Sequence, residues 1–129
     1  MVITVEWYDD DETILIEKFP HKWDAKNYYN LIDEAARLLS TKEYDVDIIG
    51  DFGDSGPPSG NILAGLRYAE EKLPPNQGYV ILVHTHKLIE VFISIVKQMR
   101  FKATENVYTV DSVDEAVAML EDLKSKEQR

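Results

Sequence analysis

Hydrophobic and polar residues follow two different periods in the first third of the chain. Residues 2–8 and 13–19 are rich in β-branched and aromatic side chains, and the polar cluster 9–12 between them predicts a β-hairpin. Residues 24–40 instead place apolar side chains at helical spacing, with Asp24 positioned to cap the first turn. The apolar positions of this predicted helix are Tyr28, Leu31, Ile32, Ala35, Leu38 and Leu39.

The alternation of strand-like and helix-like runs continues through the middle of the chain. Residues 46–52 predict a strand, and residues 61–73 predict a helix that the Pro-rich segment 74–78 ends. The continuous apolar run 79–84 is typical of a central strand that is covered on both faces.

The remaining segments predict two helices and one strand. Residues 87–100 are too long and too apolar for a strand and predict a helix, whereas residues 106–110 predict a short strand. The last helix opens at Ser112, which forms a predicted capping box with Glu115.

The predicted order of elements is ββαβαβαβα, which indicates an α/β fold. Strands that alternate with helices favour right-handed crossovers and a mostly parallel mixed sheet, here with an N-terminal hairpin and four helices. We expect one domain over residues 1–124 and a short charged tail at 125–129 that frays. Functional groups in such sheets gather beyond the carboxyl ends of the strands.

Charge and cysteine content exclude several classes of function. The 129 residues include 24 acidic and 14 basic side chains, a net charge of −10, and no basic stripe that would attract nucleic acid. The absence of cysteine excludes disulfides and thiolate chemistry. The sequence shows neither a signal peptide nor an apolar run long enough for a membrane span, so we expect a cytoplasmic protein.

The most unusual segment joins the strand at 46–52 to the next helix. Residues 48–66 read IIGDFGDSGPPSGNILAGL. With the order of elements, this segment resembles the STAS domain, in particular its SpoIIAA-like branch. The resemblance implies a SpoIIAA-like (STAS-like) fold and a non-catalytic regulatory module, in which the serine before the glycine, here Ser59, is phosphorylated to switch a protein contact.

Two roles stay open for Ser59. A phosphate there would add negative charge close to a helix N-terminus, where the helix dipole favours anions. Alternatively, Ser59 caps the helix without being modified. We expect Asp51, Asp54, Ser55 and Gly60 to form the rest of the loop surface. A constitutive phosphate site is disfavoured, because no lysine follows the glycines and Asp51 and Asp54 oppose an anion.

The very apolar helix at 87–100 indicates an interface or an apolar pocket. One stripe would contain Leu88, Phe92, Ile95, Val96 and Met99, with Ile89, Val91 and Ile93 on flanking faces. We place the interface or pocket at Leu88, Ile89, Phe92, Ile93 and Val96, with a homodimer as the simplest interface. A chain with this hairpin and helix also resembles the CRAL-TRIO lipid-binding architecture, which implies an apolar ligand or lipid beneath the helix.

His84 and His86 form an H-x-H pattern at the end of the predicted strand 79–84. Together with Asp51 or Asp54 they reach the minimum ligand count of an open metal site, so they are weak metal candidates. No nucleophile–base pair is visible, and we expect neither an enzyme nor a bound cofactor. The leading hypothesis is a protein-interaction module with an unidentified protein partner, and the alternative is a domain that binds a small apolar ligand or lipid.

Overall fold

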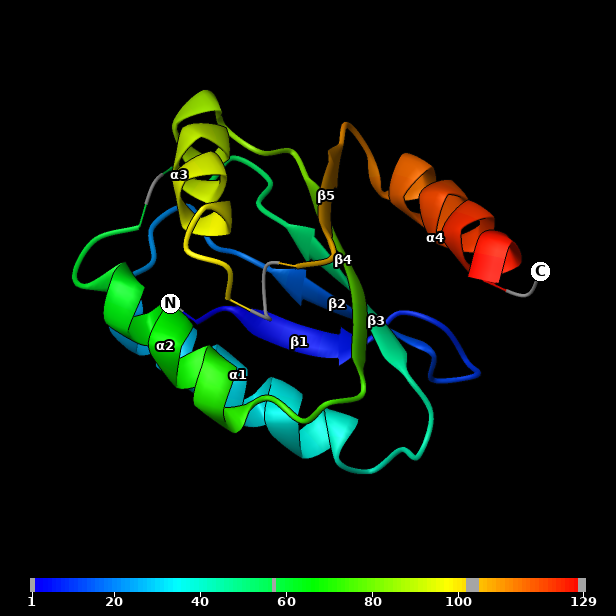
Figure 1. The fold of residues 1–129 in the computed structure, drawn as a ribbon. Coiled ribbons are helices and arrows are strands. Elements are labelled where there is room, and N and C mark those ends of the chain that lie inside the picture. The colour runs from blue at the N-terminus through cyan, green and yellow to red at the C-terminus, as the bar shows by residue number, and fades with distance from the viewer. Residues whose placement is uncertain (1, 57, 102–104, 128–129) are drawn as a thin grey trace.

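A five-stranded sheet forms the centre of the molecule (Figure 1). The computed structural model describes residues 2–56, 58–101 and 105–127. The strands are β1 (Thr4–Trp7), β2 (Ile14–Lys18), β3 (Val46–Asp51), β4 (Gln77–Val83) and β5 (Val107–Val110). The helices are α1 (Ala25–Leu39), α2 (Ile62–Lys72), α3 (Lys87–Lys97) and α4 (Val113–Glu127).

The strands lie side by side in their order along the chain, β1-β2-β3-β4-β5. β1 and β2 are antiparallel, and each later strand is parallel to the one before it. The prediction of an α/β fold with a mixed, mostly parallel sheet, an N-terminal hairpin and four helices is therefore confirmed.

The two faces of the sheet are covered by different helices. Crossovers that all step in one direction and share one hand place their helices on one face, and side chains from α1, α2 and α3 pack together on that face. α4 follows the last strand and packs on the opposite face against Ile14, Ile49 and Ile81. Figure 1 shows α1 and α2 side by side, with α4 across the sheet from them.

Three helix starts show how the caps compare with their predictions. Asp24 caps α1, because its Oδ1 accepts a 2.9 Å hydrogen bond from the Asn27 amide. Ser112 caps α4 through its Oγ and the Glu115 amide, although the Glu115 carboxylate reaches back to the Asp111 amide instead of that of Ser112. The prediction that Ser59 caps α2 is wrong: the side chain of Asn61 accepts the Ala64 amide there.

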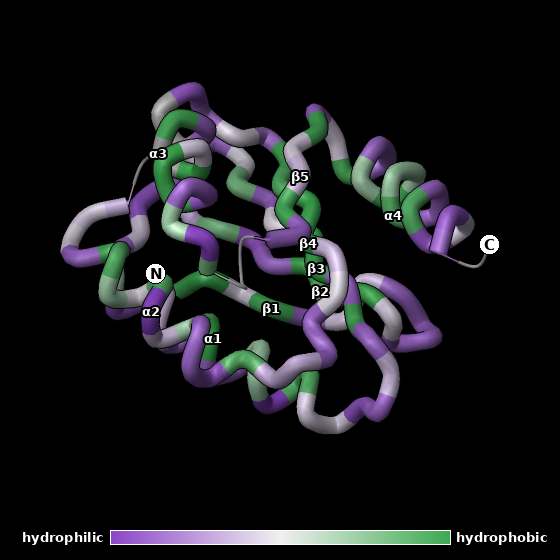
Figure 2. The backbone as a smooth tube through the Cα atoms, in the orientation of Figure 1, coloured by the Kyte–Doolittle hydropathy of each residue, from purple (hydrophilic) through white to green (hydrophobic). Residues whose placement is uncertain are grey.

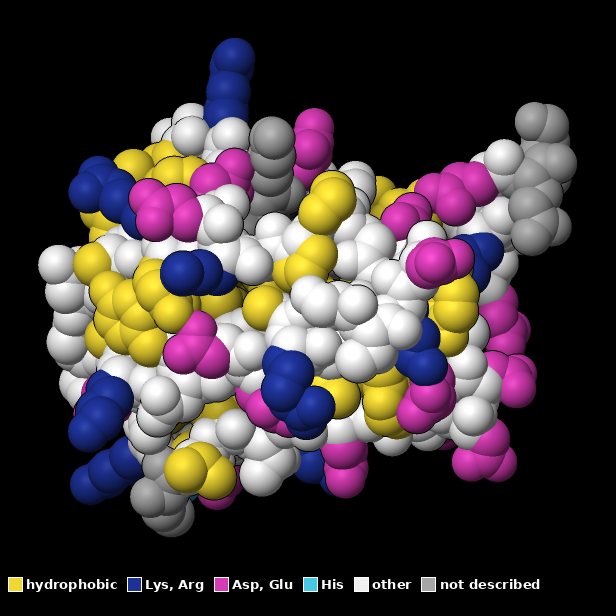
Figure 3. Space-filling view, turned by 90° about the horizontal axis from the view of Figure 1, so that it is seen from below, with side chains coloured by type: hydrophobic (Ala, Val, Ile, Leu, Met, Phe, Trp, Pro, Cys, Tyr) yellow, Lys and Arg dark blue, Asp and Glu magenta, His cyan; other side chains and the backbone are white. Residues whose placement is uncertain are grey.

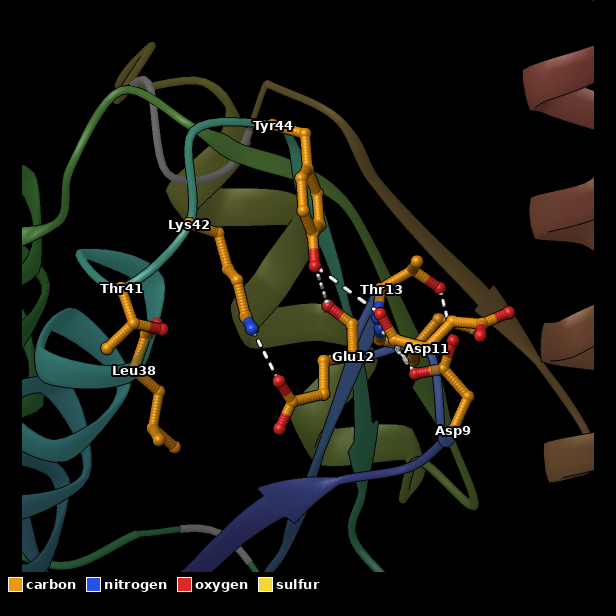
Figure 4. Close-up of polar contacts among 9 residues, drawn as sticks. Asp9, Asp11, Glu12, Thr13, Leu38, Thr41, Lys42 and Tyr44 are labelled. Atoms are coloured by element: carbon orange, nitrogen blue, oxygen red, sulfur yellow. Dashed lines mark hydrogen bonds and ion pairs between the residues drawn. The ribbon is translucent and has the colours of Figure 1, made fainter.

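The hairpin turn is bound to the loop after α1 at one end of the sheet. Lys42 forms an ion pair with Glu12, and the Tyr44 hydroxyl donates to the Glu12 carbonyl at 2.9 Å (Figure 4). Asp9 accepts hydrogen bonds from the Thr13 and Ile14 amides inside the turn. Burial of Asp9 acts to raise its pKa, but the hydrogen bonds from Thr13 and Ile14 outweigh it and lower the pKa.

α4 is longer than the sequence suggested. It continues to Glu127, so it includes the first residues of the expected tail 125–129. Two contacts hold this end of α4 to the sheet: Lys124 Nζ lies 2.8 Å from the Asp47 carboxylate, and the Tyr79 hydroxyl donates to Glu127.

The surface mixes both signs of charge. On the face drawn in Figure 3, Lys and Arg side chains are dispersed among Asp and Glu, and hydrophobic side chains gather in one larger patch. Figure 2 shows α3 as a predominantly hydrophobic helix, in contrast to the alternating character of α1 and α4.

Candidate functional site

A cavity of about 140 Å³ lies between the sheet and the three helices of its first face. β2 to β5 form its floor, α1, α2 and α3 form its walls, and the loops after β2 and β3 close one side. The lining side chains that the structure describes are Glu17, Phe19, Trp23, Tyr28, Ile32, Ile48, Phe52, Pro58, Ile62, Leu66, Leu73, Gln77, Val80, Leu82, Ile93, Val96 and Val107. The cavity is therefore predominantly apolar.

Glu17 is the one charged side chain among these lining residues. It follows the buried residues Ile14, Leu15 and Ile16 on β2, and the alternation of a strand turns it to the same face as Leu15. No hydrogen-bond donor or basic side chain within the described parts of the chain contacts its carboxylate. Glu17 is half-buried, and desolvation of its ionised form raises the pKa of Glu17 to about 7.

Tyr28 of α1 faces the same space. Burial, and then the nearby negative charge of Glu17, raise the pKa of the Tyr28 phenol. Glu17 and Tyr28 both line this predominantly apolar cavity, where the interaction between charges is stronger than in water. The phenol therefore stays protonated and can donate a hydrogen bond into the cavity.

Aromatic rings form the side of the cavity that the loops close. The Phe19 ring stacks on Phe52 at 4.4 Å between centroids and meets Trp23 edge-on at 4.9 Å. Trp23 also lies 6.3 Å from Tyr28. Within the described chain the buried Trp23 indole N–H has no hydrogen-bond partner, which leaves one polar group of the lining unsatisfied.

The loop at 51–60 contributes Phe52 and Pro58 to the cavity wall. It runs beside the segment that leads into α1, because the Ser59 amide donates to the Trp23 carbonyl at 3.3 Å and the Ser59 carbonyl accepts from the Ala25 amide at 3.1 Å. The described residues of this loop therefore contribute to the cavity through two apolar side chains, Phe52 and Pro58.

The predicted polar residues of the loop take separate positions. Ser55 is not on the loop surface as expected: it is 3% exposed, and its hydroxyl lies within hydrogen-bond distance of the Phe19 and Pro20 carbonyls. Asp54, Ser59 and Gly60 are exposed. Gly60 has a left-handed backbone with φ 83°, which separates Ser59 from the cap of α2.

Asp51 and His84 meet at the carboxyl ends of β3 and β4. The His84 Nδ1 lies 2.9 Å from the Asp51 Oδ1, which also accepts the Gly53 amide. β4 ends at Val83 and His84 has a φ of 55°, so the strand does not continue through Thr85 to align His84 with His86. In the described ranges, no three His, Asp or Glu side chains are placed to share a metal ion.

α3 turns inward only part of the stripe that the sequence predicts. Ile93 and Val96 line the cavity, as the apolar-pocket prediction requires. Ile95 and Met99 do not share their face: both are exposed, together with Val91. The side chains of Leu88, Ile89 and Phe92, which we also assigned to the interface or pocket, lie outside the described residues.

Sequence reasoning missed Glu17, the most distinctive residue of the cavity. The signal was present, since a carboxylate occupies an inward position of a strand that begins with three apolar residues. Its aromatic neighbour Phe19 falls within the predicted strand 13–19, and no prediction covered Trp23. Their convergence depends on the path of residues 19–25 beside the loop at 51–60.

Comparisons with known proteins place no further constraint on the site. No protein-family model and no curated protein sequence matches the chain. None of the helices in the described residues combines the length and apolarity that crossing a membrane requires.

Proposed function

We propose that this protein binds a small, predominantly apolar ligand in the cavity between the sheet and α1, α2 and α3. The observation that carries the proposal is a cavity of about 140 Å³ with an apolar lining and a few polar groups. Ligand sites commonly combine these two features, because the apolar wall provides affinity and the polar groups fix orientation.

The size of the cavity bounds the ligand. An engineered cavity of roughly 150 Å³ in another protein stays dry and binds benzene. A cavity of about 140 Å³ therefore suits a single ring or a short branched chain, and it is too small for a complete acyl chain. This favours a small molecule over a membrane lipid among the apolar ligands.

Toluene titration followed by ¹H–¹⁵N NMR tests this function. We expect the indole N–H signal of Trp23, a lining residue, to shift in a saturable way, while that of Trp7 stays in place. Trp7 serves as an internal reference, because it packs near Leu15 and Leu39 and under the Lys42 ammonium. A titration in which neither toluene nor any other single-ring probe moves the Trp23 signal would overturn the proposal.

A pair of matched variants distinguishes ligand binding in the cavity from a general effect on fold stability. Val80→Phe fills the cavity from β4 and should abolish the toluene response. Val110→Phe makes the same change in the cluster under α4, on the other face of the sheet, and should leave the response intact. Equal loss in both variants would show that the response reports fold stability instead of occupancy.

A second candidate function rests on the outer face of α3. Val91 and Ile95 are one turn apart on α3, Met99 lies in the turn that follows the helix, and the three are 51%, 57% and 44% exposed. We propose a second copy of this chain as the partner of this stripe. A separate proposal is that phosphorylation modifies Ser59, whose side chain is exposed. Sedimentation analysis should show a dimer that Ile95→Glu converts to a monomer, and a monomeric wild type would contradict it.

A further inference from the structure

We propose that the cavity ligand is a small organic cation, with an apolar body about the size of one ring and one protonated amine that pairs with Glu17. This inference rests on the proposed ligand-binding function and specifies the class of ligand. It follows from the charge, the aromatic surface and the volume of the cavity.

The charge of the lining calls for a cation. Glu17 brings a carboxylate to the floor of the cavity, where Gln77 is the only other polar side chain from the described strands, and among the described lining residues no basic side chain opposes it. A charge held away from water is costly unless it is paired, so a structural role would be filled better by an apolar residue. An ammonium group in the cavity supplies the missing partner.

The aromatic rings near Glu17 favour the same ligand. Phe19, Trp23, Tyr28 and Phe52 all line the cavity, and their ring centroids lie 4.4–6.3 Å from those of their neighbours within this cluster. Aromatic faces attract ammonium groups electrostatically, and they do so more strongly in sites that exclude water. The body of the ligand would in turn pack on the aliphatic side of the cavity, which includes Val80 and Ile93.

Anionic ligands are excluded by the same geometry. A carboxylate or phosphate in a cavity of about 140 Å³ would lie against the Glu17 carboxyl. The described lining provides only the Trp23 indole, the Tyr28 phenol and the Gln77 amide as side-chain donors, and no positive charge. A neutral alcohol can fit if Glu17 is protonated, so alcohol and amine must be compared directly.

The experiment uses three probes that share one ring: benzylamine, benzyl alcohol and toluene. Affinities are measured by the Trp23 indole shift at pH 8 and pH 5.5, where benzylamine stays protonated. The ionisable groups of the described lining are Glu17 of β2 and Tyr28 of α1, and Tyr28 does not titrate in this range because its pKa is raised. Benzylamine should bind about tenfold more tightly at pH 8 than at pH 5.5, because Glu17 must be ionised.

Glu17→Gln completes the test. The substitution should lower the affinity for benzylamine about tenfold at pH 8, because one ion pair is lost. It should change the affinity for toluene by less than about twofold, because the volume of the side chain is kept. Glu6→Gln removes a carboxylate from the exposed side of the neighbouring strand and should leave all three affinities unchanged.

The outcomes distinguish this inference from the function on which it rests. If all three probes bind equally and Glu17→Gln has no effect on their affinities, the proposal of a cationic ligand is wrong, while the proposed ligand-binding function is supported. If benzyl alcohol binds most tightly and its affinity falls as the pH rises, the ligand is a neutral alcohol and the proposal of a cationic ligand is again wrong. If no probe binds, the proposed function itself fails.

Discussion

Glu17 of β2 and Gly50 of β3 are direct partners in the parallel register, on the same face of the sheet. The next residue along this row is Leu82 of β4, which lines the cavity. A Cβ at Gly50 would lie 2.8 Å from the Leu82 Cδ2, closer than packed carbon atoms approach. The glycine therefore lets the Leu82 side chain lie over β3, in the row that begins with Glu17.

Gly50→Ala should abolish ligand binding with little loss of stability. The added methyl group displaces the flexible end of Leu82, and the cavity is the free space that can receive it. We expect a change in unfolding free energy of less than about 1 kcal/mol, because relief of strain is cheap where a side chain can move. Urea unfolding and toluene titration of the same sample check both parts, and a variant that binds toluene normally would contradict the role of Gly50.

Gly78→Ala should instead cause a large loss of stability. A Cβ at Gly78 would lie 2.3 Å from the Asp47 Oδ1, which is buried and already accepts the Tyr79 amide. Because the added methyl group would push the buried Asp47 carboxylate away from the Tyr79 amide, we expect a loss of about 3 kcal/mol in unfolding free energy. Urea midpoints of the two glycine variants provide the comparison, and equal midpoints would show that the two sites accommodate a methyl group alike.

The order and type of the elements could be predicted because each depends on local periodicity. The apolar spacing along 24–40 and the continuous run 79–84 read correctly as α1 and β4. The cap of α2 was harder, because Ser59 and Asn61 are both good capping residues. The left-handed turn at Gly60 separates Ser59 from the start of α2, and Ser59 is instead hydrogen-bonded to the segment before α1.

The cavity could not be predicted, because it depends on how side chains from distant segments fill a shared volume. The sequence does place an apolar stripe on α3, but it joins two residues that the structure separates: Val96 is buried while Ile95 is 57% exposed. The helix is apolar on most of its circumference, so periodicity alone does not choose its inner face (Figure 2). Packing against the sheet makes that choice.

Lys124→Met should destabilise the protein by leaving Asp47 without its ion partner. The Asp47 side chain is 3% exposed, and Lys124 Nζ lies 2.8 Å from its Oδ2. We expect a loss of about 2 kcal/mol, less than for a fully buried pair because Lys124 is 38% exposed. Lys126→Met removes the exposed pair with Asp122 and should change stability by less than about 0.5 kcal/mol. Equal urea midpoints of the two variants would show that the Asp47 pair contributes nothing.

Glu17→Gln should remove a pH dependence of stability that runs against the usual direction for a carboxylate. The folded state raises the pKa of Glu17 from 4.5 to about 7, so between these values the native protein holds a proton that the unfolded chain has lost. This contribution is complete below pH 4.5 and is lost as the pH rises through about 7, on the order of 3 kcal/mol in total. Urea unfolding from pH 4 to 8 should therefore show the variant similar to wild type at pH 4 and more stable at pH 8. Glu6→Gln should follow wild type throughout, and parallel curves for wild type and Glu17→Gln would mean that the Glu17 carboxyl is solvated in the folded protein.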